Sequence, residues 1–250
     1  MKRKKIKKRY IVLIAVVMVI VASIVFFVQF TALGYRMTVP VRSFSELAPN
    51  VYISENYKDD LTEAGKIVDE ARQRVGEFWG AVESNPMIII SDDAATIRKL
   101  GGDHDTMSFA VFNVYSYIVL SSDYLNVDVA AHELTHAEVH RRIFFGKLGY
   151  QSLIPTWFDE GVALQNDYRD AYNEEAWKAA TDNGRNVVEL GEINTAAKFY
   201  VGGLEERRYR YIVSKHELND WIDRNGISAL AGLLDKVNRG EDFDTLYFAK

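Results

Sequence analysis

The sequence from residue 130 to residue 136 reads Ala130-Ala131-His132-Glu133-Leu134-Thr135-His136. On an α-helix, positions four residues apart lie on one face, so the imidazoles of His132 and His136 can reach a single ion. The carboxylate of Glu133 then lies to one side, where it can take a proton from a water molecule at the ion. This pattern predicts a zinc site with His132 and His136 as ligands and Glu133 as the general base.

The alternative is a surface helix that carries two solvated histidines. Small or apolar side chains surround the pair, namely Ala130, Ala131, Leu134 and Ala137. A helix of this composition is typically buried on most sides. The sequence therefore favours a buried helix that positions the two histidines for metal binding.

A second segment offers a third ligand and reads Pro155-Thr156-Trp157-Phe158-Asp159-Glu160-Gly161-Val162-Ala163. Thr156 and Asp159 can form a capping box that begins a helix, which places Glu160 in its first turn. Gly161 has no side chain, so this helix can lie close to the helix of His132. We predict that Glu160 completes a ligand set of two nitrogens and one oxygen. The alternative is a glutamate that only interacts with the helix dipole.

The other histidines are weaker candidates. His140 lies one turn beyond His136, about 6 Å further along the helix, and the pattern that uses a later histidine needs a glycine where Val139 stands. We expect His140 at the surface or in contact with a ligand rather than with the metal. His104 and His216 have no supporting spacing and are expected at the surface or in the core without a chemical role.

The composition limits the available chemistry. The 250 residues include no cysteine, so disulfides and thiolate ligands are excluded, and a bound metal must use histidines and carboxylates. The net charge is −5, but seven lysines and arginines lie between Lys2 and Arg9, and without these seven the net charge is −12. An acidic body argues against nucleic acid as a partner, whereas a basic tip suits an anionic membrane surface.

Residues 11–30 contain no charged side chain. As a helix they extend for about 30 Å, the thickness of a bilayer core. The positive-inside rule places the basic tip, residues 1–10, in the cytoplasm and the body outside the cell. A cleaved signal peptide is the alternative, but its apolar core is usually about 7–15 residues long, and Thr31-Ala32-Leu33 is a poor cleavage site. We predict an uncleaved single-pass anchor at residues 11–33 in the cell membrane.

The rest of the chain is expected to form an extended connector, residues 34–50, and one α+β domain, residues 51–250. A sheet-and-helix part, residues 51–143, precedes a mainly helical part, residues 144–250. Strands are expected at 51–54 and 87–91 and in a hairpin of 109–112 with 117–120. Helices are expected at 61–79, between Asp93 and Gly101, at 171–181, 194–200, 206–222 and 227–237, and at the C-terminus.

The predicted hairpin leads into the helix of His132, which is expected to begin between Ser122 and Asn126. A strand beside such a helix can offer its unpaired edge to an extended peptide and bind it through main-chain hydrogen bonds. An ordinary hairpin within a sheet fits the sequence equally well.

The two motifs are His132-Glu133-x-x-His136 and Trp157-Phe158-Asp159-Glu160-Gly161-x-Ala163, with 23 residues between His136 and Glu160. Together they resemble the gluzincin metallopeptidases, in particular the small membrane-anchored, peptidase-MA-like bacterial proteins. The resemblance implies a zincin-like fold in which one Zn²⁺ per chain lies between a sheet-and-helix lobe and a helical lobe. It implies His132, His136 and Glu160 as ligands, Glu133 as the base, and hydrolysis of peptide or protein substrates outside the cytoplasm. Endopeptidase and aminopeptidase activity both remain compatible with the sequence.

Thermolysin-like gluzincins carry an aspartate four residues after the third ligand, and this aspartate orients a metal-binding histidine. Leu164 occupies that position here. Asp159 or a backbone carbonyl is therefore expected to orient the histidines.

Gluzincins commonly recruit a tyrosine from the lobe after the third ligand to stabilise the oxyanion, and here the resemblance points to Tyr209 or Tyr211. Tyr211, with Ser214 three residues later, is the better match. Because the two tyrosines lie on nearly opposite faces of a helix, at most one can face the zinc. The alternative is that both only pack in the core.

Two other functions fit the sequence less well. An anchored interaction or sensing domain without turnover is expected to lose part of the site, yet all four site residues are present, namely His132, Glu133, His136 and Glu160. Intramembrane proteolysis needs the motif within an apolar span, and the motif lies far beyond residues 11–30.

Overall fold

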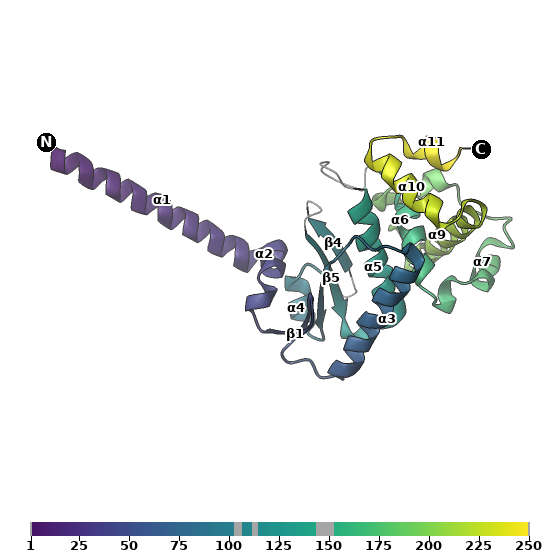
Figure 1. Cartoon of the computed structure of the whole chain (residues 1–250), viewed down its shortest axis with the longest axis horizontal. Helices are drawn as coiled ribbons and strands as arrows, with labels where there is room; N and C mark the ends of the chain where they lie inside the picture. Colours follow the sequence, from purple (N-terminus) through teal and green to yellow (C-terminus); the bar gives the residue numbers. More distant parts are fainter. Residues whose placement is uncertain (1, 103–106, 112–114, 144–152, 250) are drawn as a thin grey trace.

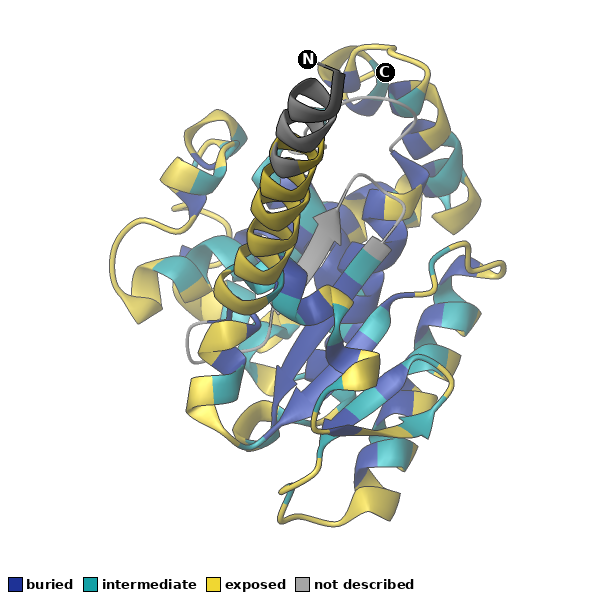
Figure 2. Cartoon of the chain, turned by 90° about the vertical axis from the view of Figure 1, so that its left-hand side faces the viewer, coloured by how far each residue is buried: buried dark blue, intermediate teal, exposed yellow. Residues whose placement is uncertain are grey.

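The computed structural model describes residues 2–102, 107–111, 115–143 and 153–249 of the chain. A long helix, α1 (Lys2–Phe30), projects from a body that contains one mixed sheet and several helices (Figure 1). The fold is therefore α+β, as predicted. Within α1, Val12–Phe30 has a mean hydropathy of 3.0 and is not buried, and Figure 2 shows this helix exposed in front of the body. This helix is long and apolar enough to cross a membrane.

Residues 34–50 do not form the predicted extended connector. They contain most of helix α2 (Ala32–Met37), a 3-10 turn (Val39–Val41) and strand β1 (Phe44–Ala48). The hydroxyl of Thr31 caps α2 by accepting a hydrogen bond from Gly34 N at 3.0 Å. Gly34 packs on α1, where a Cβ atom would lie 2.8 Å from Val28 Cα. The prediction failed because a helix of six residues is too short to show a clear periodicity.

Two arginines attach this segment to its neighbours. Arg42 donates a hydrogen bond to Val28 O at 2.8 Å, and its guanidinium lies 4.0 Å from the centre of the Tyr35 ring. Arg36 is buried and donates to Leu100 O at 2.5 Å. Helix α2 is therefore attached both to the end of α1 and to the body.

The sheet has the strand order β1-β2-β3-β5-β4, with β2 (Val51–Ser54), β3 (Met87–Ser91), β4 (Met107–Val111) and β5 (Tyr115–Ser121). Strands β2, β3 and β5 run parallel, and β1 and β4 pair antiparallel at the two edges. The predicted strands β2 and β3 are confirmed, and the two strands of the predicted hairpin pair antiparallel as β4 and β5, with β4 at an edge. Residues 112–114 of the predicted hairpin lie outside the described residues. Three consecutive isoleucines of β3 are fully buried, as expected for a strand covered on both faces, namely Ile88, Ile89 and Ile90.

Helices cover both faces of the sheet, namely α3 (Leu61–Trp79), α4 (Ala94–Lys99) and α5 (Val127–Arg142). Ile88 and Ile90 pack in one cluster with α3 and α5. Ile89 points to the other face and packs in a second cluster with α4 and Tyr35 of α2. Helix α5 and helix α2, which joins α1 to the body, therefore lie on opposite faces of the sheet (Figure 1). The predictions for α3 and for a short helix between Asp93 and Gly101 are confirmed, and the side chain of Asp93 caps α4.

The second half of the body contains α6 (Thr156–Ala163), α7 (Glu174–Thr181), α8 (Ala196–Phe199), α9 (Leu204–Asn225), α10 (Ile227–Asn238) and α11 (Phe243–Tyr247). Helices α7 and α8 are shorter than predicted. A 3-10 turn at Asp170–Tyr172 occupies the predicted start of α7, and Thr195 and Tyr200 are the caps of α8 rather than part of it. Helix α9 is longer than predicted at both ends. Buried side chains from both halves form one continuous hydrophobic cluster.

Gly161 allows α6 to pack closely on α9. A Cβ atom at this position would lie 2.6 Å from Ser214 O and 2.7 Å from Cδ2 of Leu218, both on α9. We predicted that this glycine serves an approach to the helix of His132, and that prediction is wrong. Helix α6 lies between α5 and α9 and makes contacts with both, but the glycine faces α9.

Candidate metal centre

Helix α5 carries three of the predicted site residues. It begins where predicted, after Asn126, whose side chain accepts a hydrogen bond from Val129 N at 2.9 Å. The small and apolar residues that flank the histidines are buried, namely Ala130, Ala131, Leu134 and Ala137. The structure therefore confirms a buried helix and excludes the surface helix that was the alternative.

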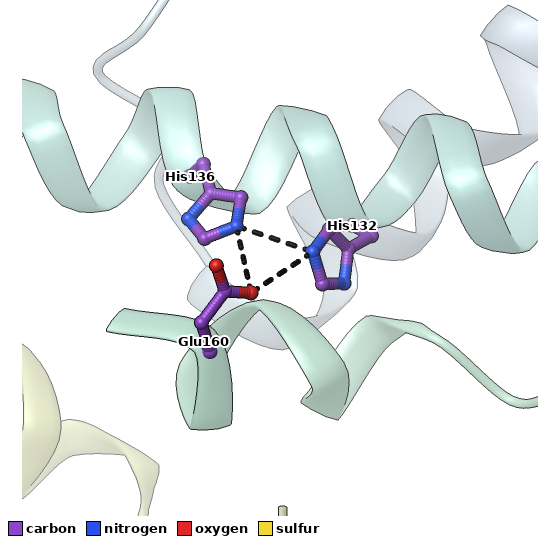
Figure 3. A group of neighbouring side chains, drawn as sticks. All are labelled: His132, His136 and Glu160. Atoms are coloured by element: carbon purple, nitrogen blue, oxygen red, sulfur yellow. Dashed lines mark hydrogen bonds and ion pairs between the residues drawn. The ribbon is translucent and has the colours of Figure 1, made fainter. Parts of the chain in front are cut away.

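The start of α6 differs from the prediction. Pro155 occupies the N-cap position, and no side chain caps the helix. The predicted capping box of Thr156 and Asp159 does not form, because the Asp159 carboxylate is bonded to His136 and His140 instead. Helix α6 nevertheless presents Glu160 to α5 (Figure 3).

Three side-chain atoms from α5 and α6 converge at one point (Figure 3). Nε2 of His132 lies 3.1 Å from Nε2 of His136, and Oε2 of Glu160 lies 3.4 Å and 3.3 Å from these two nitrogens. The three side chains are only 11%, 9% and 5% exposed. In the described part of the chain, Glu160 Oε2 is buried and accepts no well-formed hydrogen bond. The three residues are placed so that they could hold a metal ion.

Asp159 links two of the histidines of α5. Its Oδ1 atom lies 3.1 Å from Nδ1 of His136, and its Oδ2 atom lies 3.1 Å from Nε2 of His140. When Nδ1 of His136 carries the proton, its Nε2 lone pair faces His132 and Glu160. His136, His140 and Asp159 could themselves hold an ion. However, Nε2 of His136 points to His132 and Glu160, so we interpret this second group as support for His136.

Asp167 lies within ion-pair distance of His132 and was not predicted. Its side chain is completely buried, and its Oδ2 atom lies 3.7 Å from Nδ1 of His132. Arg169 holds the carboxylate through a bond from Nε to Oδ1 at 2.9 Å. A 3-10 turn at Leu164–Asn166 brings Asp167 back to the site after α6 ends. No helical spacing indicates this position, because the turn interrupts the periodicity.

The charges of the centre are mutually stabilising. Burial alone lowers the pKa of His136, but the carboxylates of Asp159 and Glu160 outweigh it and hold this pKa well above its usual value. Burial raises the pKa of Glu160, but His136 and His132 outweigh it and lower this pKa to about 2. Glu160 is therefore ionised and available as a ligand at neutral pH.

Tyr211 and Tyr209 have different surroundings. Burial raises the pKa of the Tyr211 phenol, and the negative charges of Glu160 and Glu133 raise it further. The Tyr209 hydroxyl accepts a hydrogen bond from Val188 N at 2.9 Å and donates to Asn186 O at 2.8 Å. The two tyrosines therefore face different surroundings, as their spacing predicts.

Tyr200 is a further residue that the sequence did not indicate. It follows α8, and its hydroxyl donates a hydrogen bond to Oε1 of Glu160. Burial of the phenol and the Glu160 carboxylate raise its pKa, so the hydroxyl keeps its proton. Tyr200 stands at the end of a predicted helix without a recognisable motif, and only the fold brings it to α6.

The remaining histidines behave as expected where they are described. His140 is buried and contacts Asp159 rather than the converging ligand atoms. His216 stacks on Trp177 with ring centres 3.7 Å apart. The prediction for His104 lies outside the described residues.

No protein-family model matches the chain, and no curated protein and no solved structure matches it. The function is therefore inferred from the residues of the centre themselves.

Proposed function

We propose that the protein is a membrane-anchored zinc peptidase, as the resemblance to gluzincins implies. The observation that carries the proposal is the triangle formed by His132, His136 and Glu160. In a tetrahedral zinc site with bonds of about 2.0–2.1 Å, ligand atoms lie about 3.3–3.5 Å apart. The corresponding separations here are 3.1, 3.3 and 3.4 Å.

The ligand types favour a catalytic rather than a structural zinc site. Structural zinc is usually held by four protein ligands, whereas catalytic zinc has three and an open position. Within the described residues, the converging set contains three, from two histidines and one glutamate. When bound, zinc supplies Lewis acidity and activates water.

Glu133 and Tyr211 supply the other groups that peptide hydrolysis needs. Glu133 is buried beside His132 on α5, where its carboxylate can accept a proton from water and pass it to the leaving amine. The Tyr211 phenol keeps its proton and can donate to the carbonyl oxygen as it becomes negative. We assign no catalytic role to Tyr209.

A peptide substrate is supported by the sheet edge. Strand β4 is an edge strand and contacts α5. An extended peptide that pairs with β4 would run beside the helix that carries His132 and Glu133. A silent interaction domain is the second candidate, but it gives no reason for a buried set of oriented histidines beside an ionised glutamate.

The proposed location follows from α1. The apolar part of α1 is long enough to span a bilayer, and the basic residues lie at its start. We propose that this tip is cytoplasmic and that the body lies outside. Protease added to intact cells should then digest the body and leave a short membrane-bound fragment. A fully protected body would reverse this orientation.

The activity is tested with the full-length, zinc-loaded protein in mild detergent. The wild type and Glu133→Gln are incubated with a mixed peptide library, and products are identified by mass spectrometry. We expect cleavage by the wild type only, with equal zinc content in both proteins. A wild type that holds zinc but cleaves no peptide would favour the silent interaction domain.

A further inference from the structure

Glu160 presents its two oxygens to different partners. Oε1 accepts the hydrogen bond of the Tyr200 hydroxyl. Oε2 points to the histidines, 3.4 Å from Nε2 of His132 and 3.3 Å from Nε2 of His136. One oxygen of the side chain is thus hydrogen-bonded to a tyrosine, and the other points to the place where the ion would lie. Figure 3 shows this second oxygen facing the two histidines.

We propose that Tyr200, held in place by Arg210, is a positioning residue that restricts Glu160 to binding the metal through one oxygen. The inference rests on the proposed zinc site. A carboxylate can bind a metal ion through one oxygen or through both. If Oε1 of Glu160 also bound, it would occupy the position that a catalytic zinc keeps open for water and substrate. The hydrogen bond from Tyr200 would hold Oε1 away from the metal, and the coordination position for water and substrate would then stay open.

Arg210 fixes the backbone on both sides of Tyr200. Its Nη1 atom donates to Phe199 O at 2.8 Å and to Val201 O at 2.5 Å, and these carbonyls flank Tyr200 in the chain. Phe199 is completely buried and packs edge-on against the Tyr200 ring with centres 5.2 Å apart. These contacts therefore fix the orientation of the Tyr200 phenol, although 41% of the residue is exposed to solvent.

The turn between α8 and α9 makes this arrangement possible. Gly202 has a φ of +89°, a conformation that favours glycine. Gly203 N donates to Oε2 of Glu206 at 2.6 Å, which fixes the first turn of α9. Arg210 lies one turn further along α9 and reaches back to the segment that carries Tyr200. Tyr200 and Arg210 are thus connected by one short turn that hydrogen bonds hold in place.

The simpler interpretation is that Tyr200 only stabilises the fold by satisfying a buried carboxylate. The two interpretations differ in how the metal responds when the hydroxyl is removed. A purely structural bond affects the stability of the protein but leaves the number of metal ligands unchanged. A positioning role changes the number of ligands even when the protein remains folded.

The test uses Co²⁺ in place of zinc in the full-length protein, because its visible absorption weakens as the coordination number rises above four. Tyr200→Phe keeps the ring that packs on Phe199 and removes only the hydroxyl. We expect an intense four-coordinate spectrum for the wild type and a clearly weaker one for Tyr200→Phe. Tyr209→Phe is the matched control, since it removes a phenol that is bonded elsewhere in the same half of the body, and its spectrum should equal that of the wild type.

Arg210→Met is a second variant, which retains the Tyr200 phenol but removes the hydrogen bonds from Arg210 to the backbone on both sides of Tyr200. We expect the cobalt absorption to weaken as in Tyr200→Phe, but by a smaller amount. If Tyr200→Phe does not fold, the spectrum of Arg210→Met tests the proposal instead. Wild-type spectra in both variants would overturn the role of Tyr200. If instead the wild type binds no cobalt, or Glu160→Gln leaves the wild-type spectrum unaltered, the zinc site itself is wrong.

Discussion

Nε2 of His132 and Nε2 of His136 lie 3.1 Å apart in a largely buried site. Two neutral imidazoles that both present lone pairs at this distance repel each other, and a proton or a metal ion between them removes the repulsion. Glu160 adds a negative charge at the same point. The three side chains are therefore placed so that a metal ion could be held between them.

Zinc should bind in a ratio of one ion per chain. His132→Ala and Glu160→Ala should lose the ion, because each removes one of three ligands, whereas Glu133→Gln should retain it. Elemental analysis of the purified full-length proteins measures this directly. Free zinc at 100 times its dissociation constant should stabilise the protein by about 2.7 kcal/mol, which a chelator should reverse in thermal unfolding. Equal loss of zinc in all three variants would contradict the division into ligands and base.

Asp159→Asn should weaken zinc binding by about 10- to 100-fold while the protein remains folded. The amide oxygen accepts a weaker hydrogen bond from Nδ1–H of His136 than the carboxylate does, so the tautomer that leaves the Nε2 lone pair free for the metal is less favoured. Competition with a chromogenic chelator measures the affinity. Asp220→Asn is the control, because this exposed carboxylate pairs with His216, 3.7 Å from its Nδ1 atom, rather than with His136. An unchanged affinity in Asp159→Asn would show that Asp159 is not needed to orient His136.

Gly161→Ala should destabilise the protein by about 1–3 kcal/mol, because the added Cβ atom would lie 2.6 Å from Ser214 O. The contact involves backbone, so it cannot be relieved by a side-chain rotation. Thermal unfolding in mild detergent, followed by circular dichroism, measures the change.

The control for that substitution is Gly76→Ala in α3, where a new Cβ atom would meet nothing within 4 Å. This variant should gain about 0.5–1 kcal/mol, because alanine favours the helix over glycine. If Gly161→Ala and Gly76→Ala changed the free energy of unfolding equally, α6 and α9 would not be in close contact at Gly161.

Tyr211→Phe should lower kcat by about 100-fold or more without changing the zinc content, if its phenol stabilises the oxyanion as we propose. Tyr209→Phe should be nearly silent in the same assay, because its hydroxyl is bonded to the backbone at Asn186 and Val188. Steady-state cleavage of a peptide substrate measures both. Two silent variants would remove tyrosine from the mechanism.

Local patterns in the sequence predicted the elements that carry the ligands. The spacing of His132 and His136 and the apolar residues around them define α5, and the stripe of α3 follows from its periodicity. These predictions succeed because a buried helix or strand must match the pattern of its own side chains.

The supporting residues could not be predicted in the same way. Asp167 and Tyr200 reach the centre from segments that follow a 3-10 turn and a four-residue helix, where no periodic pattern exists. The capping box at Thr156 failed because bonds to two histidines compete for the Asp159 carboxylate, and those histidines are distant in sequence. Such contacts are decided by tertiary packing.

Arg42 attaches α2 to the end of α1, and Arg36 attaches α2 to the body. Helix α1 is therefore joined to the body through side-chain hydrogen bonds on both sides of α2. The sheet stands between this attachment and α5. If α1 spans a membrane, the sheet stands between the end of that span and the candidate metal centre. A peptide substrate of the proposed enzyme would then have to extend beyond the sheet to reach His132, His136 and Glu160.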